Sequence, residues 1–163
     1  MLSRGMGKVK AVKARLSGLV GVFKTLAEQH GEVTALLESA KASDEKFTEL
    51  WPLVRRELLS HEQAEMRELY PLLRASEATR TLAEHHDAEA SELEMQIISI
   101  DELGIGSPER RELFQRLIDA VTDHAREEET DIFPRAQDAI GKDRAQALEA
   151  PLLAAKHQIA MGI

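Results

Sequence analysis

Apolar residues recur at helical spacing along most of the chain, every three to four positions, and strand-like alternation is hard to find. This pattern predicts five helices. The first spans about 8–41, the second runs from a turn at 42–44 to about 74, the third spans about 76–103, the fourth about 108–140, and a shorter tail about 143–158. The sequence therefore predicts an all-α protein.

Glycine and proline mark the expected ends and bends of these helices. Ser107 and Pro108 are typical of a helix start, and Gly141 is typical of a helix end. We expect a bend in the fourth helix near Pro134 and an interruption of the tail at Pro151. Pro52 and Pro71 predict a kink or a tighter turn at two points of the second helix.

Short connections between long amphipathic helices favour antiparallel neighbours. We therefore expect an antiparallel up-down-up-down four-helix bundle over about 16–139, with the tail as a short C-terminal extra helix. At 163 residues the chain is expected to form a single domain over 1–163. Its first 15 residues are basic without any acid, which indicates a solvated helix start.

Charge and composition exclude some classes of function. The net charge of −8 argues against nucleic acid as a partner, because a phosphate backbone requires a positive surface. The apolar run at 16–23 is too short to span a bilayer, so no transmembrane segment is expected. The absence of cysteine excludes disulfides and thiolate ligands, and fits a cytoplasmic protein.

Two stretches 63 residues apart repeat one pattern. HEQAEMRELYP at 61–71 and HAREEETDIFP at 124–134 both place Glu four residues after His, an aromatic residue at plus nine and Pro at plus ten. HGEVTALLE from His30 and HDAEASELE from His86 form a weaker pair. The chain thus reads as two helical hairpins, each with one His followed by a His-x-x-x-Glu pair.

Helical phase directs these residues inward. His and Glu four apart lie on one face of a helix, and the apolar stripes of the four long helices include six polar residues: His30, His61, Glu65, His86, His124 and Glu128. His85 lies at the edge of its stripe. Each unpaired charge in a core costs several kcal/mol, whereas the total stability of a protein is about 5 to 15 kcal/mol. The pattern therefore favours a metal that compensates these charges.

A metal-free helical interaction module, docking through its basic N-terminus, is the rival hypothesis.

The donor set suits two ions rather than one. Four imidazoles and two carboxylates are too many for one tetrahedral zinc ion. Mixed imidazole and carboxylate ligands favour iron, with manganese or zinc as the alternatives. The glutamates would bridge the two ions, and solvent oxygen would complete their coordination.

The order His, His-x-x-x-Glu, His, His-x-x-x-Glu resembles the hemerythrin-like (HHE cation-binding) family over about 16–139. The resemblance implies a four-helix bundle with a non-heme di-iron centre, its two iron ions joined by an oxo or hydroxo bridge, that binds or senses O2. It carries His30, His61, Glu65, His124 and Glu128 over as metal ligands. For the third helix, apolar phase and the repeat favour His86 over His85.

The chain departs from the oxygen carriers of that family. These have a second histidine four residues along the third helix and an aspartate five residues after the last histidine. Here the residue four positions after His86 is Ala90, and the residue four positions after His85 is Glu89. The residue five positions after His124 is Glu129 in place of aspartate. Glu89 and Glu129 are therefore further candidate ligands. The departure leaves open O2 sensing, iron handling, and an enzyme acting on peroxide, O2 or nitric oxide.

Four other residues, near the motifs or in the tail, are candidate site residues or packing residues. Glu62 is a candidate bridging carboxylate, although a solvated side chain is the simpler interpretation. Tyr70 and Phe133 are expected to pack the end of the bundle. His157 matches no repeat and is expected to be structural or exposed.

Overall fold

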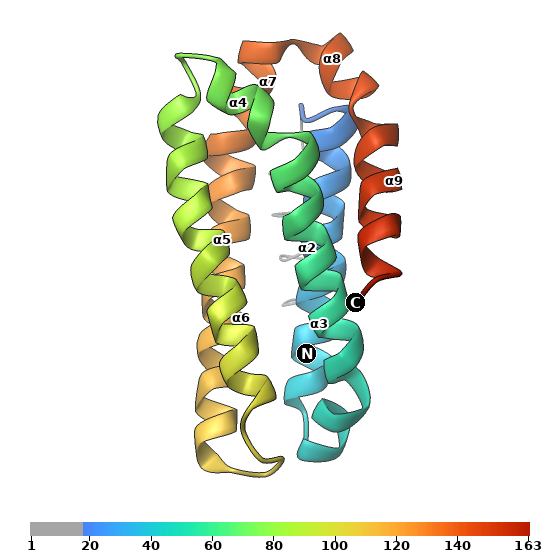
Figure 1. Cartoon of the computed structure of the whole chain (residues 1–163), viewed down its shortest axis with the longest axis vertical. Coiled ribbons are helices and arrows are strands. Elements are labelled where there is room, and N and C mark those ends of the chain that lie inside the picture. The colour runs from blue at the N-terminus through green and yellow to red at the C-terminus, as the bar shows by residue number, and fades with distance from the viewer. Residues whose placement is uncertain (1–17) are drawn as a thin grey trace, which may run out of the picture.

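A computed structural model describes residues 18–163, so the predicted basic start at 1–15 lies outside the described residues. The chain forms helices throughout and no strand over the described range, which confirms the all-α class. The elements, labelled in Figure 1, are α2 (Gly21–Lys41), α3 (Asp44–Glu68), α4 (Tyr70–Ala75), α5 (Arg80–Asp101), α6 (Pro108–Glu127), the π-helix η1 (Glu128–Ile132), α7 (Phe133–Ile140), α8 (Lys142–Ala147) and α9 (Glu149–Ala160).

The four long helices lie side by side around a common core. Neighbours along the chain, α2 with α3 and α5 with α6, are in contact, and α2 also meets α6 while α3 meets α5. Figure 1 shows α2 joined to α3, and α5 joined to α6, at the same end of the molecule. The passage through α4, and the helices α7 and α8, lie at the opposite end. Among the described residues, no helix is long and apolar enough to cross a membrane.

The predicted helix over 8–41 is not continuous. Residues 18–20 are not helical and α2 starts at Gly21, while residues 8–17 lie outside the described range. Gln137 holds this segment, since its side-chain oxygen accepts a hydrogen bond from the Val20 amide at 2.9 Å and its Nε2 donates to the Gly18 carbonyl at 2.7 Å. Gly21 also has a positive φ of 54°, and a Cβ there would lie 2.3 Å from the Ala145 carbonyl oxygen. The helix start is thus set by distant residues.

The prolines after each repeated motif change the helix in different ways. The predicted second helix breaks at Leu69, and Pro71 lies in the first turn of the new helix α4. The predicted fourth helix instead passes through the π-helix η1 immediately before Pro134. In both places proline removes one backbone hydrogen bond of the preceding turn. Pro52 is accommodated inside α3.

The C-terminal tail also differs from the prediction. Its interruption falls at Leu148, between α8 and α9, and not at Pro151. Pro151 occupies the first turn of α9, where the missing amide proton has no partner within the helix to lose. Helix α9 packs along α3, and Lys156 pairs with Glu57 of α3 at 2.8 Å.

Two apolar clusters fill the core, and a polar layer separates them. One cluster lies toward α4, α7 and α8 and includes Phe23, Leu69 and Phe133. The other lies toward the opposite end and includes Leu37 and Phe114. In each long helix the repeated histidine falls in sequence between residues of the first cluster and residues of the second. The fold therefore places these histidines at one level of the bundle.

Candidate metal centre

The polar layer is built by side chains from all four long helices and from η1. Its buried members are His30 from α2, His61, Glu62 and Glu65 from α3, His86 from α5, and Glu128 and Glu129 from η1. His124 of α6 completes it with 14% of its side chain exposed. The apolar clusters above and below exclude solvent from these groups, so each charge in the layer requires compensation from within it.

The α2 and α3 histidines form one half of the layer. The Nε2 atoms of His30 and His61 lie 3.1 Å apart. His30 Nδ1 lies 3.1 Å from a carboxylate oxygen of Glu129, and His61 Nδ1 lies 2.9 Å from the side-chain oxygen of Gln29. Both of these oxygens can accept a hydrogen bond from Nδ1, and in that tautomer each Nε2 presents a lone pair toward the other ring. In that tautomer the two facing lone pairs repel unless a cation lies between or beside them.

Glu65 extends this half toward the second one. Its carboxylate lies 3.2 Å from His61 Nε2 and 3.7 Å from His86 Nε2. Glu65 is fully buried, and neither of its oxygens has a hydrogen-bond donor. This carboxylate therefore stands between the histidines of the two hairpins, where a metal-bridging ligand would stand.

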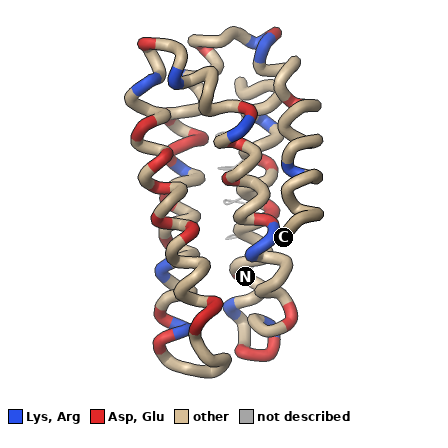
Figure 2. Tube along the Cα trace, in the orientation of Figure 1, with Lys and Arg blue, Asp and Glu red and all other residues tan. Residues whose placement is uncertain are grey.

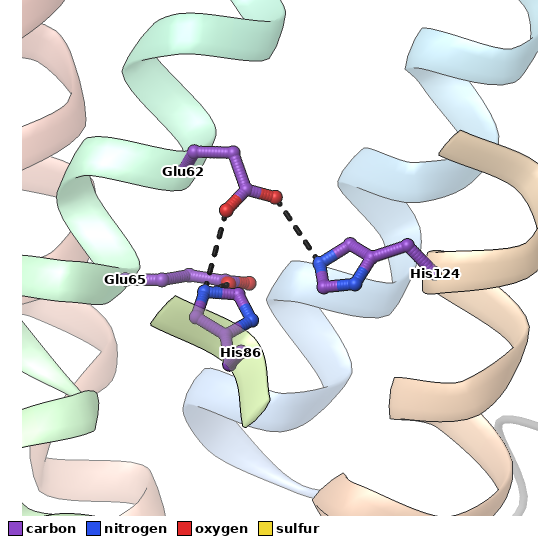
Figure 3. Close-up of side chains that lie close together, drawn as sticks. All are labelled: Glu62, Glu65, His86 and His124. Carbon is purple, nitrogen blue, oxygen red and sulfur yellow. Dashed lines mark ion pairs between the residues drawn. The ribbon is translucent and has the colours of Figure 1, made fainter. Parts of the chain in front are cut away.

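The α5 and α6 histidines form the other half, shown in Figure 3. Glu62 points between the two rings, with one oxygen 3.3 Å from His86 Nε2 and the other 3.2 Å from His124 Nε2. Glu128 contacts His124 Nε2 directly and lies 3.6 Å from His86 Nδ1. His124 Nδ1 faces a Glu89 oxygen at 2.5 Å, so His124, like His30 and His61, directs its Nε2 inward.

Many of the inward atoms lack hydrogen bonds. The atoms concerned are Oε2 of Glu62, both carboxylate oxygens of Glu65 and Glu128, both ring nitrogens of His86, and Nε2 of His124. No Lys or Arg of the described residues pairs with these carboxylates; their ion-pair partners are the histidines. Native proteins leave few buried polar atoms unsatisfied. A concentration of such donor atoms at one level of a core is typical of a metal-binding site.

The pKa values reflect this crowding of like charges. Burial, together with the Glu128 and Glu62 carboxylates, raises the pKa of Glu65 well above its usual range. Burial alone would raise the pKa of Glu128, but His124 lowers it to about 2. Burial likewise opposes the neighbouring His124 and His86 rings, which hold the pKa of Glu62 well below its usual range. Against the effect of burial, Glu128, Glu62 and Glu89 raise the pKa of His124. The layer therefore keeps Glu62 and Glu128 ionised beside His124, and Glu65 is the carboxyl that most readily keeps a proton.

Comparison with known proteins now adds to this geometry. Residues 22–136 match the family described as the Hemerythrin HHE cation binding domain. This match covers most of the chain and includes every residue of the polar layer. The chain belongs to the hemerythrin HHE family.

One curated relative is a protein named DNA nickase from Nostoc sp. strain PCC 7120. It is 26% identical to this chain over 168 residues, and the match covers 94% of this chain and 48% of the relative. This hemerythrin-family chain thus spans about half the length of that relative. Comparison with solved structures gives no match.

Of the two candidate histidines on the third long helix, His86 is the one that lies in the layer. His86 is fully buried within the layer, whereas His85 is 57% exposed and pairs with Glu89 and Glu127. The structure thus brings His86, and not His85, together with His30, His61, Glu65, His124 and Glu128. That these six residues bind metal stays a prediction.

The three other carboxylates lie in different places. Glu62 is 7% exposed and lies inside the layer, so the simpler interpretation of a solvated side chain was wrong. The His86 and His124 rings on two other helices lie against it, a situation that local sequence does not reveal. Glu89 and Glu129 face the Nδ1 atoms of His124 and His30, which makes them outer partners of these rings rather than inward donors.

Three contacts in the hemerythrin-family site were missed from the sequence. Gln29 holds His61 through a hydrogen bond across two helices. The Tyr70 ring stacks on His86 with centroids 3.7 Å apart, and the Phe133 ring stacks on His30 at 5.8 Å. Both aromatic residues are buried, as predicted, but each also fixes a histidine of the opposite hairpin. The sequence did contain a signal for these two contacts, because both motifs place an aromatic residue nine positions after the histidine.

Proposed function

We propose that the buried layer binds two iron ions. The observation that carries the proposal is the approach of the His30 and His61 Nε2 atoms to 3.1 Å while outer partners occupy both of their Nδ1 atoms. Metal-binding histidines characteristically donate their other N–H to a carboxylate or carbonyl oxygen in this way. Mixed imidazole and carboxylate donors favour iron, with manganese and zinc as the alternatives to test.

Charge balance supports two ions rather than none. Three carboxylates, those of Glu62, Glu65 and Glu128, converge on the layer from α3 and η1. Two divalent ions would more than offset them, while the four histidines remain neutral donors. A metal-free protein would have to hold the same charges in an apolar core, at several kcal/mol for each unpaired group.

The chain's own residues would fix the donors before any ion arrives. Glu129, Gln29 and Glu89 orient three of the four histidines, and the Tyr70 and Phe133 rings restrict the rotation of His86 and His30. Such preorganisation strengthens metal binding by reducing the ordering that binding would otherwise require. It fits a hemerythrin-like bundle whose four long helices follow one another in up-down-up-down order.

We further propose that the small molecule recognised at this centre is O2 or a related diatomic ligand. When bound, iron supplies a redox-active site with coordination positions that the protein leaves to a small molecule. A cavity of about 200 Å³ between α5 and α6 reaches Glu62 and His124, so the layer has a route to solvent on that side. Small ligands fit such a passage, whereas large substrates do not.

The test combines metal content with an oxygen response. Protein purified without chelator should contain two iron ions per chain, and its visible absorption should change reversibly between anaerobic and oxygenated buffer. His86→Ala should lose metal and this response, while the exposed His157→Ala should keep both. Sustained consumption of added peroxide would instead indicate the rival function, a di-iron enzyme. Fewer than one ion per chain, with stability unchanged by added iron, would refute metal binding.

DNA cleavage is not the function that we propose. The relative named DNA nickase is about twice as long as this chain, and its activity need not reside in the shared half. The net charge of −8 also argues against a DNA-binding surface here.

A further inference from the structure

The cavity between α5 and α6 has an acidic rim. Glu92, Asp123 and Glu127, which the proposed centre does not use, line it together with Glu89, and no Lys or Arg is among its lining residues. Figure 2 shows acidic positions recurring along the two helices at this side of the bundle. An acidic recess attracts cations and repels anions, and it raises the local concentration of the attracted ion.

A second group of metal-ligand residues lies at this rim. His85 Nε2 lies 2.9 Å from a Glu89 oxygen and 3.6 Å from a Glu127 oxygen, and the three donor atoms lie within 4.8 Å of one another. All three side chains are partly exposed, at 57%, 28% and 40%. One imidazole and two carboxylates in reach of solvent form an open donor set for a divalent transition-metal ion.

Glu89 connects this outer group to the buried layer. One of its oxygens faces His85, and the other faces His124 Nδ1 at 2.5 Å. At the inner end of the same cavity, Glu62 is more than nine-tenths buried and its Oε2 has no hydrogen-bond partner. A cation that leaves the outer group inward would therefore next meet the Glu62 carboxylate, which faces the His86 and His124 rings.

We propose that His85, Glu89 and Glu127 form an outer site that captures a divalent transition-metal ion and passes it through the cavity to Glu62 and His124. The proposal rests on the metal-binding function proposed above. It explains why a histidine beside the buried His86 points outward toward two carboxylates. It also assigns the acidic cavity a role in metal loading rather than in recognition of an anionic substrate.

The test follows uptake of Co²⁺ by the metal-free protein in a stopped-flow spectrometer. Glu127→Gln should slow uptake by about tenfold, the lower end of the effect of an electrostatically focusing cleft. His85→Ala should also slow uptake, because it removes the nitrogen ligand of the outer group. Both should still bind two Co²⁺ per chain at completion. Glu94→Gln is the matched control, since it removes one carboxylate of exposed α5 surface that does not line the cavity, and its uptake should equal that of the wild type.

A titration provides the second readout. With the centre filled, excess Co²⁺ should occupy one further, weaker site in the wild type and in Glu94→Gln, and this site should be absent in His85→Ala. Equal uptake rates in wild type and His85→Ala, or a third ion that survives this substitution, would overturn the outer site while leaving the centre intact. A wild-type protein that binds no Co²⁺ in the layer would overturn the proposed function as well.

Discussion

Glu65→Gln should change stability in opposite directions with and without metal. Glu65 is fully buried, faces the Nε2 atoms of His61 and His86, and shares the layer with two other carboxylates. In the metal-free protein the substitution removes a carboxyl group whose ionisation is opposed by burial and by the Glu128 and Glu62 carboxylates. The new amide can donate to an Nε2 lone pair, so the side chain gains a hydrogen bond where the carboxylate had none.

The pH dependence follows from the raised pKa of Glu65. Burial and its carboxylate neighbours raise this pKa above the ordinary value of 4.5. The folded state therefore binds the proton more tightly than the unfolded state, and the associated stability is lost as the pH rises toward the folded pKa. A buried polar group without a hydrogen-bond partner costs about 1 to 3 kcal/mol. At neutral pH the metal-free variant should be more stable than wild type by about this amount, and the gap should close as the pH falls toward 4.5.

With metal the order should reverse. An ion present at a hundredfold excess over its dissociation constant adds about 2.7 kcal/mol to stability, and Glu65→Gln should lose most of this gain. Thermal unfolding followed by circular dichroism, with chelator and with added Fe²⁺ under anaerobic conditions, measures both effects. A change of 1 kcal/mol moves Tm by about 2 to 4 °C in a chain of this size.

The control for this experiment is Glu112→Gln, which disrupts an exposed pair with Arg116 and should change stability by less than about 0.5 kcal/mol in either condition. If Glu65→Gln instead destabilised the metal-free protein by more than about 1 kcal/mol, Glu65 would be a structural hydrogen-bond acceptor. If the variant kept the full stabilisation by metal, Glu65 would not be a ligand.

Three further predictions test the surroundings of the layer. Gln29→Ala should weaken metal binding by about 10- to 100-fold, because His61 loses the partner that orients it, and competition with a chelator of known affinity measures the change. Apparent metal affinity should rise with pH, because protons held on Glu65 and His86 must be displaced when metal binds. The gain should reach up to about tenfold per pH unit for each proton released. Titrations at two pH values test this, and a pH-independent affinity would contradict it. His157→Ala should change neither metal content nor Tm, because its side chain is exposed on α9, and a loss of metal would show that the tail contributes to the site.

Helical phase was sufficient to predict the four histidines of the layer and two of its carboxylates, Glu65 and Glu128. His30, His61, His86 and His124 each continue an apolar stripe, so period 3.6 alone turns them inward. The choice of His86 over His85 follows from the same argument, since adjacent residues of a helix point about 100° apart. The all-α class required nothing beyond this periodicity.

Contacts between helices and departures from the regular helix were beyond that reasoning. Gln29 reaches His61 on another helix, and Glu62 is buried by neighbours that its own helix does not reveal. The π-helix η1 adds a residue to one turn, which shifts the helical phase and brings both Glu128 and Glu129 inside. The start of α2 at Gly21 depends on Gln137, more than a hundred residues away.

Anomalous diffraction at the iron absorption edge tests the central claim most directly. Crystals of protein purified without chelator should show two anomalous peaks inside the bundle. One should lie beside the Nε2 atoms of His30 and His61, and the other beside His86 and His124. Absence of any peak in the polar layer of iron-loaded protein would contradict the account.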